Sequence, residues 1–260
     1  MKDTCDICGK KVFLPYKCKY CGGTFCSEHR LPENHNCPGI QYWNVPVKVK
    51  KEPRVGGLAI LSFGANNLVI ITCLVLFFIS ILVPEFTIRY LALHPSIPIL
   101  ISMPWQFLTS IFLHLGFWHF FVNTFVLLFF GGELERRLGS RRYLELFLLS
   151  GIAGNFGYVV YANLISSSSP ALGASAAVFG VMGCLAIIAP EIRMIIFPFP
   201  IPINIRAALI LFAIYDFWMM IANSIGVFST NVANIAHLAG LAIGVYYGRK
   251  IRKYSHRYDR

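Results

Sequence analysis

Charged residues are scarce in this chain of 260 residues. Asp, Glu, Lys and Arg together make up 13% of it, while hydrophobic residues make up 56%. This charged content is about half that of an ordinary globular domain. A soluble protein of this length has too small an interior for so much apolar surface, because most of its surface must face water. The composition therefore excludes a soluble globular protein and a disordered chain, and it predicts a protein that crosses a membrane several times.

Several functional signatures are also missing. The H-E-x-x-H motif of membrane zinc proteases and the G-x-G-D motif of membrane aspartyl proteases do not occur. The chain has no internal repeat, whereas a small-solute transporter would usually show paired half-repeats or broken helices. The basic stretch at residues 249–260 is too short to argue for nucleic-acid binding, so no nucleic-acid partner is expected. Residues 1–50 lack the apolar core of a signal peptide, so we expect the cysteines among them to stay reduced.

Six apolar segments have about the length of a bilayer-spanning helix, which needs roughly 20 residues. They are residues 66–83, 105–130, 143–165, 173–189, 205–225 and 232–248. Basic residues gather outside them: residues 1–54 hold ten Lys and Arg, and residues 249–260 hold six. If the helices alternate in direction, Arg89 is the one basic residue in the loops of the opposite side. The positive-inside rule then places both ends of the chain in the cytoplasm of a cell-membrane protein.

Six of the eight cysteines lie close together near the start of the chain, and two histidines accompany them. The pattern is Cys5-x2-Cys8-x9-Cys18-x2-Cys21-x4-Cys26-x2-His29-x5-His35-x-Cys37. Eight such ligands suffice for two tetrahedral zinc ions and leave no open position for a catalytic water. A disulfide cluster would not explain the two histidines. Because so short a module has too little core to fold alone, zinc would supply its folding energy.

This pattern resembles AN1-type zinc fingers at all eight ligand positions. The resemblance implies a cross-braced arrangement in which each zinc ion has three cysteines and one histidine. One ion would be held by Cys5, Cys8, Cys26 and His29, and the other by Cys18, Cys21, His35 and Cys37. Because both metal sites are full, we expect a structural module or one that docks a protein partner.

Few polar residues interrupt the apolar segments, and each is a candidate functional residue because polar groups are costly in a bilayer. Ser175 begins a segment rich in Gly and Ala, and His237 lies in a second one with Gly240 and Gly244. Small residues let two helices approach closely. At 1.5 Å per residue, Ser175 and His237 differ in depth by roughly 5 Å before tilt. The pair is a candidate nucleophile with its base, and the alternative is a packing serine with a structural histidine.

Two further polar residues, His119 and Asn123, are four positions apart and therefore share one helix face. Both donate hydrogen bonds, and with the backbone N–H of Ser175 they would form an oxyanion hole.

Two acidic residues of the apolar region are expected to be structural. Asp216 is a lone acid in the fifth segment, whereas an aspartyl protease needs two, so we expect it to bond a neighbour such as Tyr215 or Trp218. Glu135, near the end of the second segment, is expected to tie that end to the arginine-rich loop.

Together these motifs resemble the rhomboid family of intramembrane serine proteases. The matches are Gly173-Ala-Ser175, His119-x-x-x-Asn123, Ala236-His237-x-x-Gly240-x-x-x-Gly244 and the stretch Gly131–Ser140 that contains Glu135. The resemblance covers about residues 58–250. It implies that Ser175 is the nucleophile, that His237 is the general base and that no catalytic cofactor is needed. Ala176, Phe179 and Gln106 stand where the family commonly has Gly, Tyr and Arg.

The expected fold is an all-α membrane protein, a six-helix rhomboid bundle with a small zinc-stabilised finger. The expected domains are the finger at 1–40, a linker at 41–57, the rhomboid domain at 58–250 and a basic cytoplasmic tail at 251–260. The resemblance implies cleavage of transmembrane segments in membrane-protein substrates, at a site that opens toward the extracytoplasmic side. The alternative is an inactive rhomboid-like protein that binds membrane segments for quality control.

Overall fold

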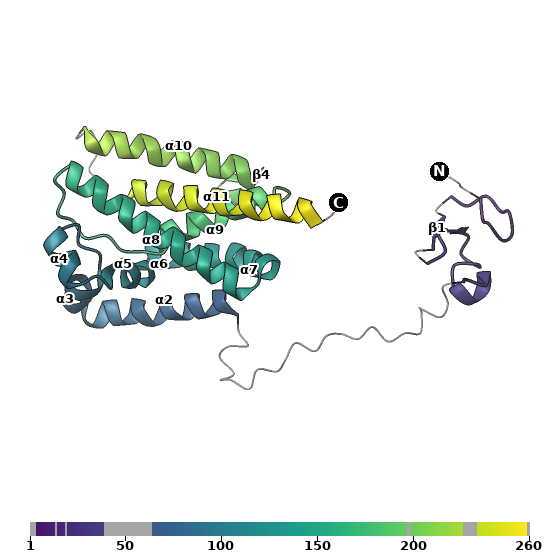
Figure 1. Cartoon of the computed structure of the whole chain (residues 1–260), viewed down its shortest axis with the longest axis horizontal. Coiled ribbons are helices and arrows are strands. Elements are labelled where there is room, and N and C mark those ends of the chain that lie inside the picture. The colour runs from purple at the N-terminus through teal and green to yellow at the C-terminus, as the bar shows by residue number, and fades with distance from the viewer. Residues whose placement is uncertain are drawn as a thin grey trace. The chain divides into compact units, whose positions relative to one another are not determined.

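The structure of the protein, a computed structural model, covers most of the chain. The residues that it describes are 4–13, 15–18, 20–38, 64–196, 199–225 and 233–258. They fall into two compact units, Met1–Gly56 and Gly57–Arg260 (Figure 1). The expected linker at 41–57 lies outside the described residues.

The smaller unit has little regular structure. Strands β1 (Tyr16–Lys17) and β2 (Thr24–Phe25) pair antiparallel, and the 3-10 helix η1 (Pro32–His35) follows. The buried residues of its core are Cys5, Cys18, Phe25, Cys26 and Cys37. Because four of these five are cysteines, the chemistry of the thiols decides how this unit holds together.

The larger unit is a bundle of helices (Figure 1). Its long helices are α2 (Ala65–Leu82), α8 (Ser140–Leu164), α9 (Ser175–Ile188), α10 (Ile205–Ser224) and α11 (Asn234–Tyr258). A sixth helical stretch consists of α6 (Phe117–Val126), the π-helical turn η5 (Leu127–Gly131) and α7 (Gly132–Leu138). A hairpin of β3 (Arg193–Ile196) and β4 (Phe199–Asn204) joins α9 to α10. The basic segment expected to be a tail continues α11 as far as Tyr258.

Four helical stretches among the described residues are long and apolar enough to cross a membrane. They are Ala65–Leu82, Phe117–Leu138, Ser140–Leu164 and Ile205–Ser224. The sequence predicts six such spans, and the difference concerns the two helices at the centre. Helix α9 has only 14 residues, of which ten are buried. Helix α11 is long enough, but Asn234 and His237 lie near its start and Arg249 and Lys250 follow further on, which lowers its hydropathy.

The second apolar segment does not form one helix from residue 105. Gly116 has a φ of 89°, and α6 begins only after it, at Phe117. The chain before it folds into short helices: α3 (Pro84–Phe86), η3 (Thr87–Leu91), α4 (Ile97–Ser102), α5 (Gln106–Thr109) and η4 (Ser110–Phe112). Gln106 is fully buried there and accepts a hydrogen bond of 3.1 Å from the backbone N–H of His94. Gln106 therefore anchors this segment of the chain.

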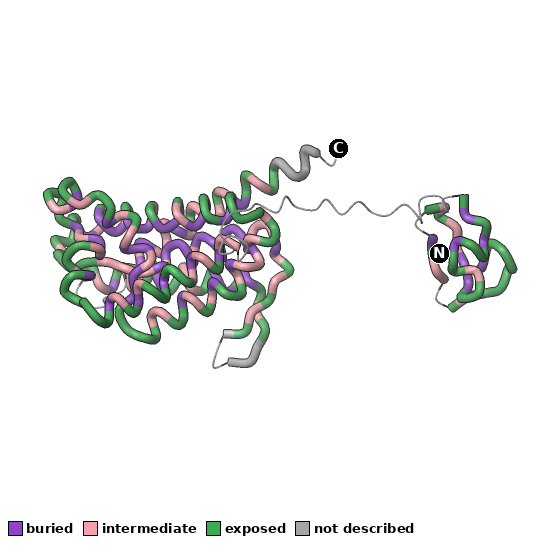
Figure 2. The backbone as a smooth tube through the Cα atoms, turned by 90° about the horizontal axis from the view of Figure 1, so that it is seen from below, coloured by how far each residue is buried: buried purple, intermediate pink, exposed green. Residues whose placement is uncertain are grey.

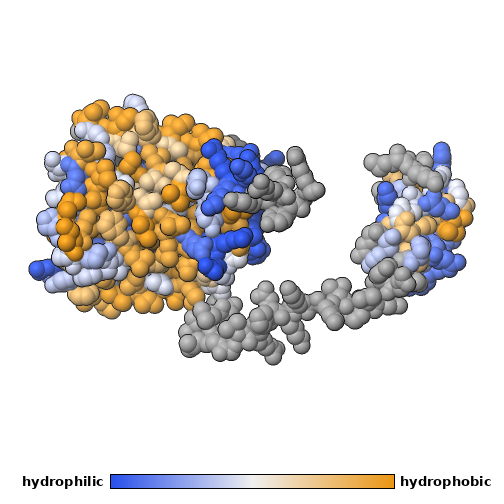
Figure 3. Space-filling model, in the orientation of Figure 1, coloured by the Kyte–Doolittle hydropathy of each residue, from blue (hydrophilic) through white to orange (hydrophobic). Residues whose placement is uncertain are grey.

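The surface of the bundle is apolar, as a lipid environment requires. Figure 2 shows buried residues along the inner side of the helices and exposed ones along the outer side. The exposed side chains include Ile81, Phe125, Trp118 and Ile214. In Figure 3 a wide hydrophobic area covers the face of the bundle that is turned to the viewer. The largest hydrophilic patch on this face lies at the end of the bundle that carries α7. The larger unit is therefore embedded in a membrane.

Candidate functional site

The site is built on the close approach of α9 and α11. A Cβ atom added at Gly240 would collide with the backbone carbonyl oxygen of Ala176, and one added at Gly244 would collide with that of Gly180. The two backbones are thus in direct contact, as small residues at a helix interface allow. As a result the imidazole Nε2 of His237, on α11, lies 2.8 Å from the hydroxyl Oγ of Ser175, on α9.

Ser175 is the first residue of α9. Gly173, two residues earlier, has a φ of 129°, which an L side chain rarely adopts, so the turn into the helix depends on glycine. The first N–H groups of a helix have no partner within it and carry a partial positive charge. The amide of Ser175 belongs to this first turn, so a developing negative charge beside its hydroxyl would be stabilised.

The ring of His237 is held on two further sides. Its Nδ1 lies 3.1 Å from Oδ2 of Asp216, on α10. The ring of Phe179 stacks on it with the centroids 4.7 Å apart and the planes inclined by 7°. The His237 side chain is 14% exposed and that of Asp216 is 5% exposed. Water therefore has limited access to this part of the site.

The expectation that Asp216 bonds Tyr215 or Trp218 is wrong. Those two rings point outward and are 60% and 64% exposed, whereas Asp216 is 3% exposed. Its Oδ1 accepts a hydrogen bond of 2.6 Å from the side-chain amide of Asn234, and its Oδ2 faces His237. Sequence reasoning missed Asp216 and Asn234 as parts of the site. One signal was present, since Asn234 and His237 are three residues apart and share a helix face.

His119 and Asn123 both lie on α6. The ring of His119 rests against Gly173, where an added Cβ would lie 2.7 Å from Nε2 of His119. Asn123 is buried, and its amide donates a hydrogen bond of 2.7 Å to the backbone carbonyl of His119. The structure thus brings His119 to the turn before Ser175, while this hydrogen bond of Asn123 stays within its own helix.

Glu135 contacts the arginine-rich loop, as expected, and it also reaches the first membrane helix. Its carboxylate accepts hydrogen bonds of 2.6 Å and 3.0 Å from the backbone N–H groups of Ala65 and Asn66, at the start of α2. It also accepts one of 2.5 Å from the hydroxyl of Ser140. A carboxylate at this position satisfies amides that have no partner in the helix and complements the helix dipole. Glu135 therefore ties α7 to the first membrane helix.

The finger contains two clusters of candidate metal ligands. One consists of Cys5, Cys8, Cys26 and His29, and the other of Cys18, Cys21, His35 and Cys37. Within each cluster the ligand atoms lie within 4.8 Å of one another. These two sets match the pairing that the finger resemblance implies.

The donor sets fit tetrahedral zinc. The Sγ atoms of Cys8 and Cys26 are 3.7 Å apart and those of Cys18 and Cys37 are 3.9 Å apart. A tetrahedron with Zn–S bonds of about 2.3 Å has S–S edges of about 3.8 Å. Hydrogen bonding from the backbone of Cys21 lowers the pKa of the Cys18 thiol to about 6, which favours the thiolate that a metal binds.

His35 provides an independent sign of a metal. Its Nε2 is buried and has no hydrogen-bond partner among the described residues. Its Nδ1 lies 2.9 Å from the backbone carbonyl of His29, and Phe25 stacks on the ring. A metal-bound histidine typically shows this arrangement, with one nitrogen on a carbonyl and the other on the ion. The two donor sets of the finger thus fit structural zinc.

Comparison with known proteins assigns families to both units. Residues 102–254, more than half of the chain, match the Rhomboid domain family, and residues 5–42 match the AN1-like zinc finger family. The chain is 35% identical to "Rhomboid protein 1, mitochondrial" of Saccharomyces cerevisiae, over 55% of this chain and 41% of that protein. It is 26% identical to "Rhomboid protease GlpG" of Salmonella paratyphi A, over 80% of this chain and 67% of that protein.

A third relative is named as inactive. The chain is 36% identical to "Inactive RHOMBOID-like protein 8" of Arabidopsis thaliana, over 31% of this chain and 22% of that protein. The chain spans less than half the length of the yeast and plant relatives. The family assignment rests on the domain match, and the relatives include proteins named as proteases. The chain belongs to the rhomboid family and carries an AN1-like zinc finger in addition.

Proposed function

We propose that this protein is an intramembrane serine endopeptidase that cleaves transmembrane segments of other membrane proteins. Ser175 is the nucleophile and His237 is the general base. The observation that carries the proposal is the distance of 2.8 Å between Oγ of Ser175 and Nε2 of His237. A serine hydroxyl is a weak nucleophile by itself, and a base at this distance can take its proton as it attacks.

The reaction is an acyl transfer. Oγ of Ser175 attacks the carbonyl carbon of the scissile peptide bond, and Nε2 of His237 takes the hydroxyl proton. The C–N bond then breaks, and His237 returns the proton to the leaving amine. Water attacks the resulting ester with His237 again as base, which releases the acid product and restores Ser175.

The negative charge on the attacked carbonyl oxygen needs donors. We assign that role to the side chains of His119 and Asn123 and to the backbone N–H of Ser175. Two observations support this: His119 lies against Gly173, and Ser175 begins α9. During catalysis the amide of Asn123 would exchange its bond to the carbonyl of His119 for one to the oxyanion. Loss of one such donor typically costs about 10²- to 10³-fold in rate.

The membrane unit acts as a six-helix bundle with both ends of the chain in the cytoplasm. In this assignment α9 and α11 join the four longer spans as the two central helices. The exposed arginines on either side of the turn between α7 and α8, Arg136 and Arg141, support a cytoplasmic position for that end. Ser175 then lies toward the extracytoplasmic face, and substrates have helix-breaking residues near that face and a small residue before the cut.

The proposed domains are the finger at 1–40, a linker at 41–57, the rhomboid domain at 58–250 and a basic tail at 251–260. The finger would be a docking module for a protein partner, with the ring of Phe13, which is 99% exposed, as one apolar contact.

A second candidate is an inactive rhomboid-like protein that binds membrane segments. The similarity to the plant relative named as inactive favours it. The contact between Ser175 and His237 favours the protease, because a protein that only binds segments has no need of a hydrogen-bonded nucleophile and base.

Labelling with a fluorophosphonate probe distinguishes the two candidates. The protein is purified in detergent with zinc bound, as wild type and as Ser175→Ala, His237→Ala and Ser102→Ala. Ser102 is exposed and its hydroxyl donates to the carbonyl of Ile99 in its own helix, so its variant is the matched control. We expect labelling of the wild type and of the control, and none of the other two. Folded wild type without labelling would reject the protease.

A further inference from the structure

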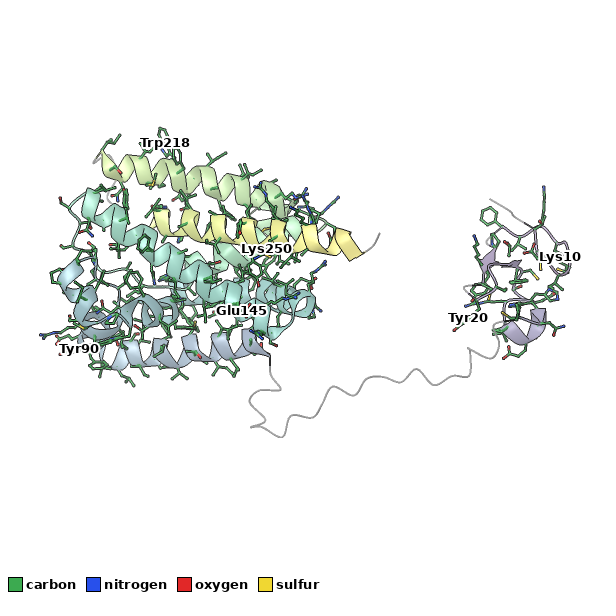
Figure 4. The ribbon with its side chains drawn as sticks, in the orientation of Figure 1. Lys10, Tyr20, Tyr90, Glu145, Trp218 and Lys250 are labelled. Carbon is green, nitrogen blue, oxygen red and sulfur yellow. The ribbon has the colours of Figure 1, made fainter. Side chains whose placement is uncertain are left out.

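Asp216 is a buried carboxylate in the middle of α10, a helix that also carries many exposed apolar side chains. Figure 4 shows Trp218 projecting from the outer side of α10, and its ring is 64% exposed. Tyr215, on the other side of Asp216 in sequence, is 60% exposed. Asp216 itself is 3% exposed and therefore points into the bundle. An ionised carboxylate in such a place is costly unless it is paired and hydrogen-bonded.

Both oxygens of this carboxylate are directed at α11. Oδ1 accepts a hydrogen bond of 2.6 Å from the side-chain amide of Asn234, and Oδ2 lies 3.1 Å from Nδ1 of His237. Nε2 of the same ring lies 2.8 Å from Oγ of Ser175. Asp216, His237 and Ser175 thus form one continuous chain of hydrogen bonds from three helices. Acid, base and nucleophile have the same order in Ser–His–Asp hydrolases.

We propose that Asp216 is a positioning residue that completes a Ser175–His237–Asp216 triad in this protein. The inference rests on the proposed protease function and goes beyond its two-residue mechanism. The carboxylate keeps the proton of the neutral ring on Nδ1, which leaves the lone pair of Nε2 free for the proton of Ser175. It stays ionised throughout and stabilises the imidazolium that forms, while the proton moves only between Oγ, Nε2 and the leaving amine.

Asn234 sets the direction of these hydrogen bonds. Its amide N–H donates to Oδ1 of Asp216, so the group at position 216 must present an acceptor to it. In Asp216→Asn the new side chain would turn its oxygen to Asn234 and its NH₂ group to Nδ1 of His237. Nδ1 would then have to accept, and the ring proton would move to Nε2. This tautomer cannot take the proton of Ser175.

The same hydrogen-bond pattern suggests a second variant that should restore the tautomer of His237. In the double variant Asp216→Asn with Asn234→Asp, the carboxylate at position 234 accepts from the NH₂ group at position 216. The amide oxygen at position 216 then faces Nδ1 of His237, and the ring keeps its proton there. The two side chains have exchanged places with the same atom count and the same net charge, so the packing changes little. A purely structural role of Asp216 gives no reason for the tautomer to follow this exchange.

The test has two readouts on the full-length, zinc-loaded protein in detergent. The first is the rate constant of fluorophosphonate labelling per folded molecule, with folding checked by thermal unfolding. The second is the ¹⁵N spectrum of the histidine rings, in which His237 is identified by its loss in His237→Ala. Tyr215→Phe is the matched control, because it removes one exposed polar atom next to Asp216.

We expect Asp216→Asn to label about 10²- to 10⁴-fold more slowly and to move the proton of His237 from Nδ1 to Nε2. The exchange variant is expected to restore the Nδ1–H tautomer and to recover part of the rate. An unchanged rate and tautomer in Asp216→Asn would overturn the triad while the protease stands. If Asp216→Asn fails to fold, the exchange variant decides: a ring with its proton on Nε2 overturns the triad. If the wild type is not labelled, the protease function is rejected. The tautomer of His237 in the variants still tests whether Asp216 positions the ring.

Discussion

One histidine in each unit of the protein is held by a stacked aromatic ring and by a polar partner on Nδ1. In the finger, His35 has Phe25 on its face with the ring centroids 3.9 Å apart, and its Nδ1 lies 2.9 Å from the carbonyl of His29. In the membrane unit, His237 has Phe179 on its face at 4.7 Å, and its Nδ1 lies 3.1 Å from the carboxylate of Asp216. The remaining nitrogen of His35, Nε2, has no partner among the described residues and is left free for a metal ion. The remaining nitrogen of His237, also Nε2, lies 2.8 Å from Oγ of Ser175.

The difference lies in the charge of the partner on Nδ1. A backbone carbonyl favours the neutral ring with its proton on Nδ1, and the free Nε2 of His35 is then suited to a metal ion. A carboxylate fixes the same tautomer and in addition stabilises a positive ring. In the proposed mechanism His237 takes a proton, whereas His35 only has to hold an ion. Two similar frames would then serve binding in one unit and proton transfer in the other.

Loss of zinc is the largest expected effect, and it should separate the two units. A structural zinc site contributes an apparent free energy of about 10–16 kcal/mol, more than so small a core can replace. Cys18→Ser, or a chelator, should therefore unfold the finger and expose it to protease. The fluorophosphonate labelling rate of Ser175 should not change, because all four proposed catalytic side chains lie in the larger unit.

Limited proteolysis, zinc content and labelling of the same samples check this prediction. Cys73→Ala is the control, because Cys73 lies in the core of the membrane unit and its loss should leave both zinc ions bound. A labelling rate that falls together with zinc content would show that the finger supports the active site, and the two histidines could then not be treated as independent.

Removal of the close contact between α9 and α11 should have the next largest effect. Of the two histidines, it should affect His237 and leave His35 unchanged. Gly240→Ala places a Cβ against the carbonyl oxygen of Ala176 and pushes α11 away from α9. Such overpacking typically costs about 1–3 kcal/mol of the free energy of unfolding. Labelling should fall as well, since Ser175 and His237 are brought together by this contact.

Unfolding in mixed detergents gives the free energy, and probe labelling gives the rate. Gly132→Ala is the control, since Gly132 is helical and an added Cβ there would meet only Nδ2 of Asn66, at 3.9 Å. Without a clash, that substitution gains helix propensity of about 1 kcal/mol at most. Equal losses in the two variants would mean that the contact with Ala176 does not set the distance between the helices.

The part of the site that could be predicted from sequence depends on short, local patterns. The eight finger ligands lie in one string, so their number and spacing predicted two zinc sites, and the resemblance to AN1-type fingers implied how they divide into the two clusters. Ser175 and His237 could be paired because glycines around each predicted that their helices would touch. The tautomer-fixing partner of His237 could not be predicted. Asp216 is 21 residues away on another helix, and sequence does not show how α10 is rotated about its axis.

Two of the six predicted spans, α9 and α11, lack the length or the hydropathy of the four candidate membrane helices among the described residues, for a related reason. Apolar content does not distinguish lipid contact from burial against protein. Helix α9 is apolar because other helices surround it, and its 14 residues need not match the thickness of a bilayer. The second helix was expected to begin at residue 105, but it begins at Phe117. Gly116, with a φ of 89°, is not helical and separates this helix from the segment before it. The glycine was visible in the sequence, but its conformation depends on the fold of the segment before it.

The smallest expected effect concerns a second carboxylate and extends the comparison from histidines to acids. Glu135 accepts from the backbone N–H groups of Ala65 and Asn66, so its charge serves the start of α2 and has no histidine to act on. Glu135→Gln keeps the shape but removes the charge, and loss of such a cap typically costs about 0.5–2 kcal/mol. Glu133→Gln is the matched control, since Glu133 pairs with arginines at the surface, where an ion pair contributes about 0–1 kcal/mol.

Unfolding and labelling, measured together, should show that Glu135 and Asp216 have different roles. Glu135→Gln should lower the free energy of unfolding and leave the labelling rate per folded molecule and the tautomer of His237 unchanged. Asp216→Asn should change the rate and the tautomer more than its stability explains. A slower rate in folded Glu135→Gln would mean that the start of α2 also acts on the site. The carboxylate on His237 would then not be distinguished from one that only supports the fold.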